Sequence, residues 1–263
     1  MAQLGLDFPT KWGRGYVARL VRNMYWKYYI TPVIRRMSTL RVEGAENLEG
    51  RGPFIFVANH NSHLDTPLLL TALPPHVRRR TIVAAAMDNF FMTTLKAFRT
   101  VLVFNAIPID RHKINRRSSQ LALELVEDHW NLLLYPEGGR SPDGNLQEFK
   151  GGAAYLAERS KALVVPTYIH DAGFLRGPKY AKAPQYTHGP TRRRHHVTVT
   201  FGHPLKAEAS ENIRRFGARI EEAVAEIPGL QKGGIAAFGS HDPRSGTRCA
   251  NTGVPTQRPR RRG

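Results

Sequence analysis

Side chains that can transfer a proton are concentrated in one short stretch of the chain. Residues 59–65 read Asn-His-Asn-Ser-His-Leu-Asp and directly follow an apolar run. An imidazole that is hydrogen-bonded to a carboxylate can act as a general base, because its second ring nitrogen is left to accept a proton from a hydroxyl. His60 and Asp65 are five residues apart, so they can meet if His60 lies in a loop and Asp65 in the first turn of a helix.

The same stretch has two other interpretations. The histidines can be loop residues with Asp65 as a helix cap, or His60, His63 and Asp65 can form part of the metal site of a metal-dependent hydrolase. Against a metal, no second cluster of His, Asp or Glu at ligand spacing is visible, and His195-His196 lies in a basic stretch that repels cations. We therefore expect no bound metal, and we expect Ser62 to cap a helix rather than act as a nucleophile.

Two arginines have the chemistry to bind a phosphate group. Arg111 and Arg140 each follow an apolar run that predicts a strand. A guanidinium offers forked donors that match phosphate oxygens, and backbone N–H groups around Gly138 and Gly139 could add a small anion-binding nest. A surface ion pair would explain either arginine alone, but both are expected at the same edge of the sheet as His60.

Four segments carry a resemblance to a known family. They are residues 59–65, 107–111, 132–141 and 163–168, and in order and spacing they resemble the glycerolipid acyltransferases, a family defined by a His-x4-Asp motif. Lysophosphatidic acid acyltransferases are its commonest members, and the resemblance spans roughly residues 38 to 205. The third segment departs from the family pattern Pro-Glu-Gly-Thr-Arg-Ser, because Gly139 replaces the Thr. That replacement loosens the turn, so the resemblance predicts the reaction class but does not predict which acceptor is used.

The resemblance implies transfer of a fatty acyl group from a thioester, either acyl-CoA or acyl carrier protein, to a glycerol hydroxyl of a lysophospholipid. The family's default acceptor is 1-acyl-sn-glycerol-3-phosphate, which gives phosphatidic acid. His60 would take the hydroxyl proton, and Asp65 would fix the imidazole tautomer and stabilise the imidazolium. No cofactor is expected, because the thioester drives the transfer and the acceptor supplies the nucleophile.

The roles of two further site residues follow from the resemblance alone. Glu137 would contact the polar head of the acceptor, and Pro166 would shape the wall near the acyl group. His63 is expected to be structural, with lining of the site as the alternative. The remaining residues expected to bind substrate are Arg111, Gly138, Gly139, Arg140 and Ser141.

Short apolar runs alternate with helical patterns along the chain, which predicts an α/β fold. Residues 53–58 show no polar alternation, as expected for a strand that helices cover on both faces. The other strands are expected at 39–44, 81–86, 105–110, 131–135, 163–169 and 196–201, and helices at about 62–73, 115–128, 149–160 and 211–227. We predict a mostly parallel central sheet flanked by helices on both faces, forming an acyltransferase domain over residues 38–230.

Residues 1–37 are predicted to form an N-terminal segment with an amphipathic helix over residues 15–30. Aromatic side chains mixed with cations are typical of a helix in a membrane interface, but a helix packed on its own domain has the same pattern. Trp26 falls on the polar side, and Pro32 is expected to end or kink the helix. The residues of the apolar face are Val17, Leu20, Val21, Met24, Tyr25 and Tyr28.

The most apolar region, residues 90–104, also has two interpretations. It can be a helix of the core or the wall of a groove for the acyl chain, and the pattern does not separate them. Core packing is enough to explain any single side chain in this region.

The chain carries a large positive charge, which narrows the classes of partner. Lys and Arg number 39 against 21 Asp and Glu, a formal net charge of +18. Such a surplus favours nucleic acid, an anionic membrane surface or phosphorylated substrates. A basic nucleic-acid-binding protein is thus the second alternative function, but it would present aromatics interleaved with cations, whereas the aromatics here lie in apolar segments. We expect an anionic membrane surface as partner and no specific nucleic acid.

Basic residues are frequent in two Gly- and Pro-rich stretches. Residues 171–195 are predicted to form a long basic loop, and residues 231–263 a disordered basic tail. From Lys232 onward the chain has seven Lys or Arg and one Asp, a net charge of +6, which leaves +12 on the rest. The surplus is therefore not confined to the tail.

The single Cys249 excludes an intramolecular disulfide and fits a reducing compartment. No stretch approaches about 18 uninterrupted apolar residues, and the N-terminus lacks the layout of a secretory signal. We expect a cytoplasmic protein bound peripherally to the inner face of a membrane; the sequence does not indicate its oligomeric state.

Overall fold

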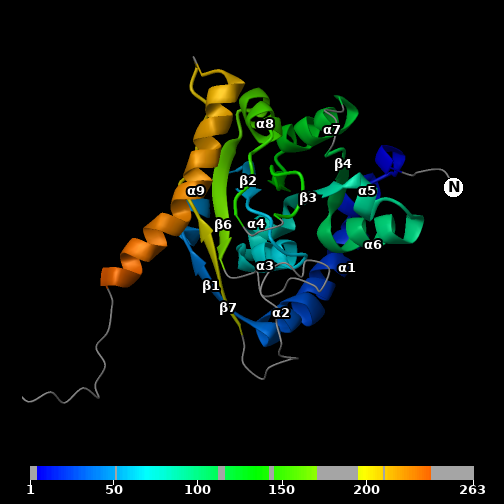
Figure 1. Cartoon of the computed structure of the whole chain (residues 1–263). Coiled ribbons are helices and arrows are strands. Elements are labelled where there is room, and N and C mark those ends of the chain that lie inside the picture. Colours follow the sequence, from blue (N-terminus) through cyan, green and yellow to red (C-terminus); the bar gives the residue numbers. More distant parts are fainter. Residues whose placement is uncertain are drawn as a thin grey trace, which may run out of the picture.

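The computed structural model of the protein describes residues 5–50, 52–111, 116–141, 145–170, 195–209 and 211–237. Its centre is a seven-stranded sheet in the order β1-β7-β6-β2-β5-β3-β4 (Figure 1). The strands are β1 Ser38–Glu43, β2 Phe54–Ala58, β3 Thr81–Ala86, β4 Ala106–Ile109, β5 Asn131–Leu134, β6 Leu163–His170 and β7 His195–Phe201. Every strand expected from the sequence is present, and its ends lie within one residue of the expected ones.

Five neighbouring strands run parallel to one another. β2 pairs in parallel with β5 and β6, and β3 pairs in parallel with β5 and β4. β7 is antiparallel to β6 and parallel to β1, so these two strands run in the opposite direction at one end of the sheet. The prediction of a mostly parallel sheet is confirmed, and the carboxyl ends of β2 to β6 meet at one edge.

The helices are α1 Tyr16–Tyr25, α2 Thr31–Met37, α3 Asp65–Ala72, α4 Pro75–Arg79, α5 Met87–Phe90, α6 Thr94–Phe104, α7 Arg116–Glu127, α8 Gly152–Ser160 and α9 Ile213–Ala237. Short 3-10 turns occur at Gly5–Asp7, Lys11–Arg14 and Ala45–Leu48. The helices expected near 62–73 and at 115–128, 149–160 and 211–227 correspond to α3, α7, α8 and α9.

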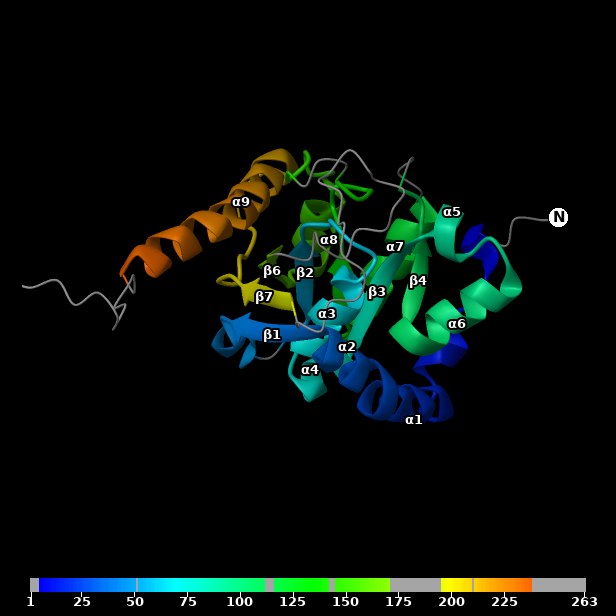
Figure 2. The ribbon, with the colours of Figure 1, turned by 60° about the horizontal axis from the view of Figure 1, so that its bottom comes forward.

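Helices cover both faces of the sheet and enclose a hydrophobic core on each. Alternate residues of β2 enter the two cores: Phe54, Phe56 and Ala58 lie in one, Ile55 and Val57 in the other. The first core also takes residues from α2, α3 and α6, and the second takes residues from α7, α8 and α9 (Figures 1 and 2). Because both faces are covered, β2 is buried throughout, which is why its sequence lacks alternation.

The N-terminal helix runs without a break from Tyr16 to Met37. A π-helical turn, Trp26–Ile30, separates α1 from α2. The helix does not end at Pro32, because this residue lies in the first turn of α2, where a missing N–H is tolerated. The interruption expected at the proline takes the form of the wider π turn just before it.

The apolar face of α1 points away from the protein. Val17, Met24 and Tyr28 are 71%, 54% and 65% exposed, whereas Trp26 and Arg22 are 3% and 8% exposed. Trp26 does lie on the side of the helix that carries Arg22, as the sequence pattern predicts, but this side faces the domain rather than solvent. The helix contacts the domain through the face that carries Arg22 and Trp26.

Arg22 and Trp26 are buried because they bind the carboxyl end of α6. The last carbonyls of a helix have no partner within it. Arg22 donates from Nε to the carbonyl of Leu102 at 2.7 Å and from Nη2 to that of Val101 at 3.0 Å. Trp26 donates from Nε1 to the carbonyl of Val103 at 2.8 Å. Side-chain donors of α1 and of the π turn after it thus cap α6, and Figure 2 shows α1 and α6 side by side.

The most apolar region contains α6, which packs on the core with one face only. Ala97 and Val101 are fully buried, while Leu95 and Phe98 are 59% and 46% exposed. The ring of Phe98 stacks on Trp12 with a centroid distance of 4.8 Å. The outer face of α6 therefore adds apolar surface next to α1.

The C-terminal helix is longer than expected. α9 continues across Pro228 to Ala237, ten residues beyond the end expected at 227. The rest of the tail, 238–263, and the basic loop at 171–194 lie outside the described residues. Within the described residues, no helix is long and apolar enough to cross a membrane.

Candidate active site

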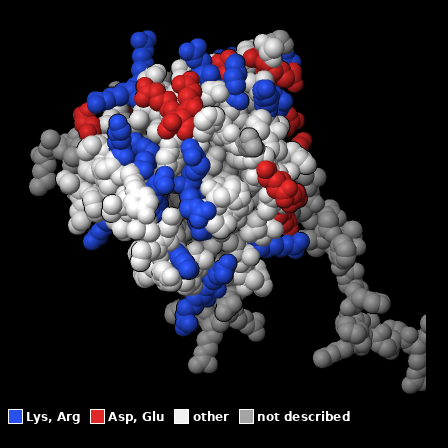
Figure 3. Space-filling model, turned by 180° about the vertical axis from the view of Figure 1, so that it is seen from behind, with Lys and Arg blue, Asp and Glu red and all other residues white. Residues whose placement is uncertain are grey.

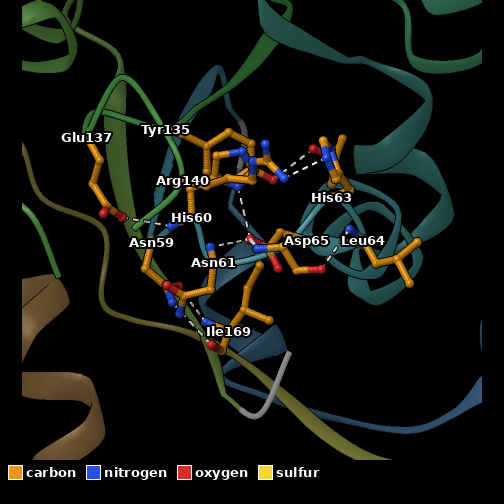
Figure 4. Close-up of polar contacts among 12 residues, drawn as sticks. Asn59, His60, Asn61, His63, Leu64, Asp65, Tyr135, Glu137, Arg140 and Ile169 are labelled. Atoms are coloured by element: carbon orange, nitrogen blue, oxygen red, sulfur yellow. Dashed lines mark hydrogen bonds and ion pairs between the residues drawn. The ribbon is translucent and has the colours of Figure 1, made fainter. Parts of the chain in front are cut away.

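Two loops at the carboxyl edge of the sheet form the candidate site. One follows β2 and contains residues 59–64, and the other follows β5 and contains residues 135–141 (Figure 4). β2 and β5 are adjacent and parallel, so their loops leave the sheet side by side. The backbone N–H of Ser141 donates to the carbonyl of His60 at 2.8 Å, which joins the two loops directly.

His60 and Asp65 form the hydrogen-bonded pair that the spacing predicts. His60 lies in the loop, α3 begins at Asp65, and His60 Nδ1 is 2.9 Å from Asp65 Oδ2. A carboxylate accepts hydrogen bonds only, so it selects the imidazole tautomer with the proton on Nδ1. Nε2 then carries the lone pair that a base needs.

Asp65 is fully buried and is held by backbone donors. Its Oδ2 accepts from the N–H groups of Asn61 at 2.6 Å and Ser62 at 2.7 Å, in addition to the imidazole. Ser62 Oγ accepts from the N–H of Leu64 at 3.2 Å, a contact within the loop; the N-cap of α3 is Leu64, without a side-chain cap, so the expected capping role of Ser62 is wrong. The carboxylate therefore has a fixed position relative to the loop that carries His60.

Tyr135 packs against the imidazole of His60, a contact that the sequence pattern did not predict. Its ring stacks on His60 with a centroid distance of 4.1 Å and an interplanar angle of 20°. Its hydroxyl is 3.0 Å from Thr66 Oγ1. Burial, and then the Asp65 carboxylate, raise the pKa of Tyr135 well above its usual value, so the phenol stays protonated. The only sign of this role in the sequence is that Tyr135 directly precedes the Pro-Glu-Gly run at 136–138.

Glu137 holds the loop of His60. Its Oε1 accepts from the backbone N–H of His60 at 2.7 Å, and its Oε2 accepts from that of Gln147 at 3.2 Å (Figure 4). Both oxygens thus bind backbone groups of the protein. The contact between Glu137 and the acceptor's head group, which the resemblance implies, stays a prediction.

Asn59 ties the same loop to β6. Its side-chain amide accepts from the N–H of Ile169 at 2.8 Å and donates to the carbonyl of Ile169 at 3.2 Å. The amide therefore replaces a backbone pairing at the end of β2. The polar type of Asn59 was visible in the sequence, but its partner lies 110 residues away.

Arg140 lies beside the catalytic pair and contacts His63. Arg140 Nη1 is 2.6 Å from His63 Nε2. Burial lowers the pKa of His63 below its usual value, and the Arg140 and His60 charges act in the same direction, against Asp65. The guanidinium, His63 and the candidate base are thus part of one cluster.

Arg111 lies at the same edge but farther along the sheet. It follows β4, three strands from β2, which corresponds to about 14 Å at ordinary strand spacing. Its Nη2 and Nε bind Asp88 Oδ2 at 2.6 and 3.0 Å. Lys150 Nζ donates to the carbonyl of Arg111 and also lies over Gly138. Lys150 therefore links Arg111 to the turn before Arg140 and adds a cation that the sequence analysis missed.

The two glycines of the third motif differ in their backbone. Gly138 has a φ of +71° and donates its N–H to the carbonyl of Tyr135 at 3.2 Å, so this group is used within the turn rather than in an anion nest. A Cβ at Gly139 would meet nothing within 4 Å. Position 139 therefore has room for the Thr of the family pattern.

Pro166 and Ser141, both expected to contact substrate, are buried. Pro166 is buried inside β6, opposite Val57 of β2, and its carbonyl accepts from Gly202 at 2.7 Å. Ser141 is 3% exposed. Both residues support the site from within the fold, and their contact with substrate stays a prediction.

The metal interpretation finds little support in this geometry. The described residues include no group of three or more His, Cys, Asp or Glu side chains that could hold a metal ion. His63, the second histidine of the proposed ligand set, contacts a guanidinium instead. A cation at this distance would compete with a metal for the same lone pair.

Comparison with known proteins agrees with this chemistry. A family model described as Acyltransferase matches residues 39–170. The chain is 32% identical over 146 residues to the 1-acyl-sn-glycerol-3-phosphate acyltransferase of Saccharomyces cerevisiae, covering 54% of this chain and 46% of that protein. It is 28% identical over 156 residues to the alpha form from Ovis aries, covering 56% and 51%. The chain spans about half the length of these relatives.

The fold also has a counterpart among crystal structures. The 1-acyl-sn-glycerophosphate acyltransferase from Thermotoga maritima superposes with a TM-score of 0.58 and 22% identity, covering 85% of this chain and 83% of that chain. At this identity the likeness establishes the fold. The family model covers half of the chain and includes His60, Asp65 and Arg140, so the protein belongs to the acyltransferase family.

Proposed function

We propose that the protein is an O-acyltransferase that moves a fatty acyl group from a thioester to a glycerol hydroxyl of a lysophospholipid. The acceptor we propose is 1-acyl-sn-glycerol-3-phosphate, and the product is phosphatidic acid. The observation that carries the proposal is the buried pair of His60 and Asp65 next to Arg140. Family membership and the names of the similar proteins support the same reaction.

His60 acts as the general base in this proposal. Its Nε2 takes the proton of the glycerol hydroxyl while the oxygen attacks the thioester carbonyl. The carbon–sulfur bond then breaks, and the proton held by His60 passes to the leaving thiolate. Asp65 stabilises the imidazolium between these steps, and Tyr135 restricts the ring to one plane.

The acceptor's phosphate provides a reason for the cations at the edge of the sheet. Arg140 is next to His63 in the loop that contacts His60, so a phosphate bound there would hold the glycerol hydroxyl near the base. Arg111, which Asp88 binds and orients, stays a second proposed phosphate ligand at the neighbouring part of the edge.

We also propose that the protein works on the inner face of an anionic membrane, where both the acceptor and the product reside. The outward apolar face of α1 and the exposed side chains of α6 support this placement. Figure 3 shows Lys and Arg side chains on the back of the molecule beside broad uncharged areas. Apolar contacts flanked by cations are the combination that holds a helix in a membrane interface.

An acyl-transfer assay tests the proposal. Labelled acyl-CoA and acyl carrier protein are each supplied with lysophosphatidic acid or lysophosphatidylcholine, and the labelled product is quantified. We expect transfer to lysophosphatidic acid with at least one donor. His60→Ala should reduce kcat/KM by about a hundredfold or more, the usual contribution of a general base.

Two further variants complete that assay. Arg140→Ala should raise KM for lysophosphatidic acid more than for lysophosphatidylcholine, because only the first presents a phosphate monoester. His76→Ala replaces an exposed histidine of α4 and should leave the rates unchanged. Near-normal turnover of His60→Ala would refute the mechanism, and transfer to neither acceptor would refute the function.

A further inference from the structure

We propose that His63 is a positioning residue: in its neutral form it holds the Arg140 guanidinium in place for the acceptor's phosphate. The inference rests on the proposed function and adds a residue outside the His-x4-Asp pair. It also makes acceptor binding sensitive to pH in a way that depends on one imidazole.

The two side chains meet because both of their loops are fixed. His63 lies between the buried Ser62 and the buried Asp65, whose hydrogen bonds hold the loop before α3. Arg140 is followed by Ser141, whose N–H binds the carbonyl of His60. The 2.6 Å contact between Arg140 Nη1 and His63 Nε2 therefore joins two anchored segments (Figure 4).

Only one protonation state of His63 permits this contact. A guanidinium has five N–H donors and no acceptor, so His63 Nε2 must contribute a lone pair. A protonated imidazole carries N–H on both nitrogens and a positive charge, and it would repel Arg140. The contact is thus present with neutral His63 and lost with the imidazolium.

The surroundings of His63 keep it neutral near pH 7. Burial and the charges of Arg140 and His60 lower the pKa of His63, and Asp65 raises it by less. Among the described residues these are the charged and titratable groups that act on the ring. The neutral form is therefore present above the lowered pKa and is lost as the pH falls through it.

The consequence for catalysis appears in KM. Arg140 binds the phosphate equally before and during the reaction, so its displacement weakens acceptor binding without changing the chemical step. As the pH falls through the lowered pKa of His63, KM for lysophosphatidic acid should rise more steeply than titration of the acceptor's phosphate alone would cause. The acceptor's own titration also raises KM at low pH, because the second pKa of a phosphate monoester is about 6.

Two substitutions separate His63 from the acceptor's own titration. His63→Gln keeps a carbonyl oxygen that can accept from Arg140 but does not titrate. His63→Leu removes the acceptor and keeps similar bulk. We expect wild-type KM at pH 7.5 for His63→Gln, with a shallower rise at low pH, and a KM about five- to tenfold higher at every pH for His63→Leu. kcat should change less than twofold in both, and His76→Gln should match wild type throughout.

A double-variant cycle shows whether His63 acts through Arg140. In the Arg140→Ala background, His63→Leu should have no further effect on KM, because its partner is absent. An equal effect in both backgrounds, or wild-type KM in His63→Leu, would overturn the inference while leaving the transferase activity intact. A low-pH rise in His63→Gln as steep as in wild type would also overturn it.

Calorimetric binding of glycerol 3-phosphate adds a measurement that needs no turnover. His63→Leu should weaken its binding at pH 7.5 by the same factor as KM, and His63→Gln should not. If wild type transferred no acyl group yet showed this pattern, the proposed reaction would fail and the positioning role would stand. If wild type bound no glycerol 3-phosphate, the positioning role would fail.

Discussion

The imidazole of His60 is restrained by contacts from three residues. Asp65 binds Nδ1, Tyr135 stacks against the ring, and Glu137 binds the backbone N–H of the same residue. Each contact removes a different freedom, namely tautomer, ring plane and backbone position. A base held in this way needs little reorganisation when the hydroxyl arrives, which is how positioning contributes to rate.

The turn that carries Arg140 offers a stability test at two neighbouring glycines. Gly139→Ala should raise the free energy of unfolding by about 0.4–1 kcal/mol, because its Cβ meets no atom and the unfolded chain loses freedom. Gly138→Ala should lower it by about 1–2 kcal/mol, because a left-handed backbone disfavours a Cβ. Urea denaturation measures both changes.

The two variants serve as controls for each other, since they make the same substitution one residue apart. Equal destabilisation by both would show that Gly139 is required by the turn, contrary to its open surroundings. Gly139→Thr, which restores the family residue, should behave like Gly139→Ala in this measurement.

At the residue scale, local spacing predicted the site only where both partners lie in one loop. His60 and Asp65 are separated by five residues, so a loop followed by a helix start was enough to bring them together. The contacts of Tyr135, Lys150 and Arg140 join different strands and loops, and no local pattern encodes them. Arg111 was expected at the same edge of the sheet as His60, but its position along that edge depends on strand order, which places it three strands away.

Among the elements, the hydrogen bonds between the N-terminal helix and α6 determine which side of the N-terminal helix faces outward. Arg22 provides three hydrogen bonds, to Leu102, Val101 and Gly13, and burial lowers its pKa to about 10, so it stays charged at pH 7. A cation at the carboxyl end of a helix is also favoured by the helix dipole. The side chain thus fixes the helix by capping rather than by hydrophobic burial.

Replacing this cap should cost more than replacing a neighbouring arginine. Arg22→Met keeps the apolar stem but leaves buried carbonyls of α6 without donors, so we expect the free energy of unfolding to fall by about 2–3 kcal/mol. Arg19→Met alters an exposed residue of the same helix and should change it by no more than about 0.5 kcal/mol. Chemical denaturation compares the two, and equal effects would remove the capping role.

The strands were predictable because each is a short apolar run bounded by polar residues, and coverage on both faces leaves a clear signature in β2. The orientation of α1 was not predictable, because periodicity identifies two faces but does not say which one meets protein. Trp26 and Arg22 share the inward face since both donate to α6, a partner about 80 residues away. Likewise, the pattern after 227 gave no sign that α9 continues across Pro228.

Across the whole molecule, the positive charge and the outward apolar surface would contribute to membrane binding in different ways. Cations attract the surface over a Debye length of about 8 Å at physiological salt, and apolar side chains act only after contact. A cluster of exposed apolar side chains, such as those on α1 and α6, is unfavourable in water unless it contacts a partner. These two contributions are the reason we propose that the outward apolar face of α1 contacts lipid.

A vesicle flotation assay tests this face directly. Leu20 and Met24 are 49% and 54% exposed on α1, and Leu20→Asp with Met24→Asp should weaken partition onto anionic vesicles about a hundredfold or more. The expected size follows from about 1.5–3 kcal/mol for each apolar side chain that no longer enters the interface. Ile213→Asp, at an exposed apolar residue at the start of α9, should leave partition unchanged.

Salt and lipid charge then separate the two contributions. Raising the salt concentration, or replacing anionic lipid with zwitterionic lipid, should weaken partition of wild type because the cations are screened or lose their partner. The Leu20 and Met24 variant should keep that salt dependence at a lower overall affinity, since its Lys and Arg residues are intact. Undiminished flotation of the variant would place the membrane contact elsewhere on the protein, and loss of flotation with Ile213→Asp would make α9 part of it.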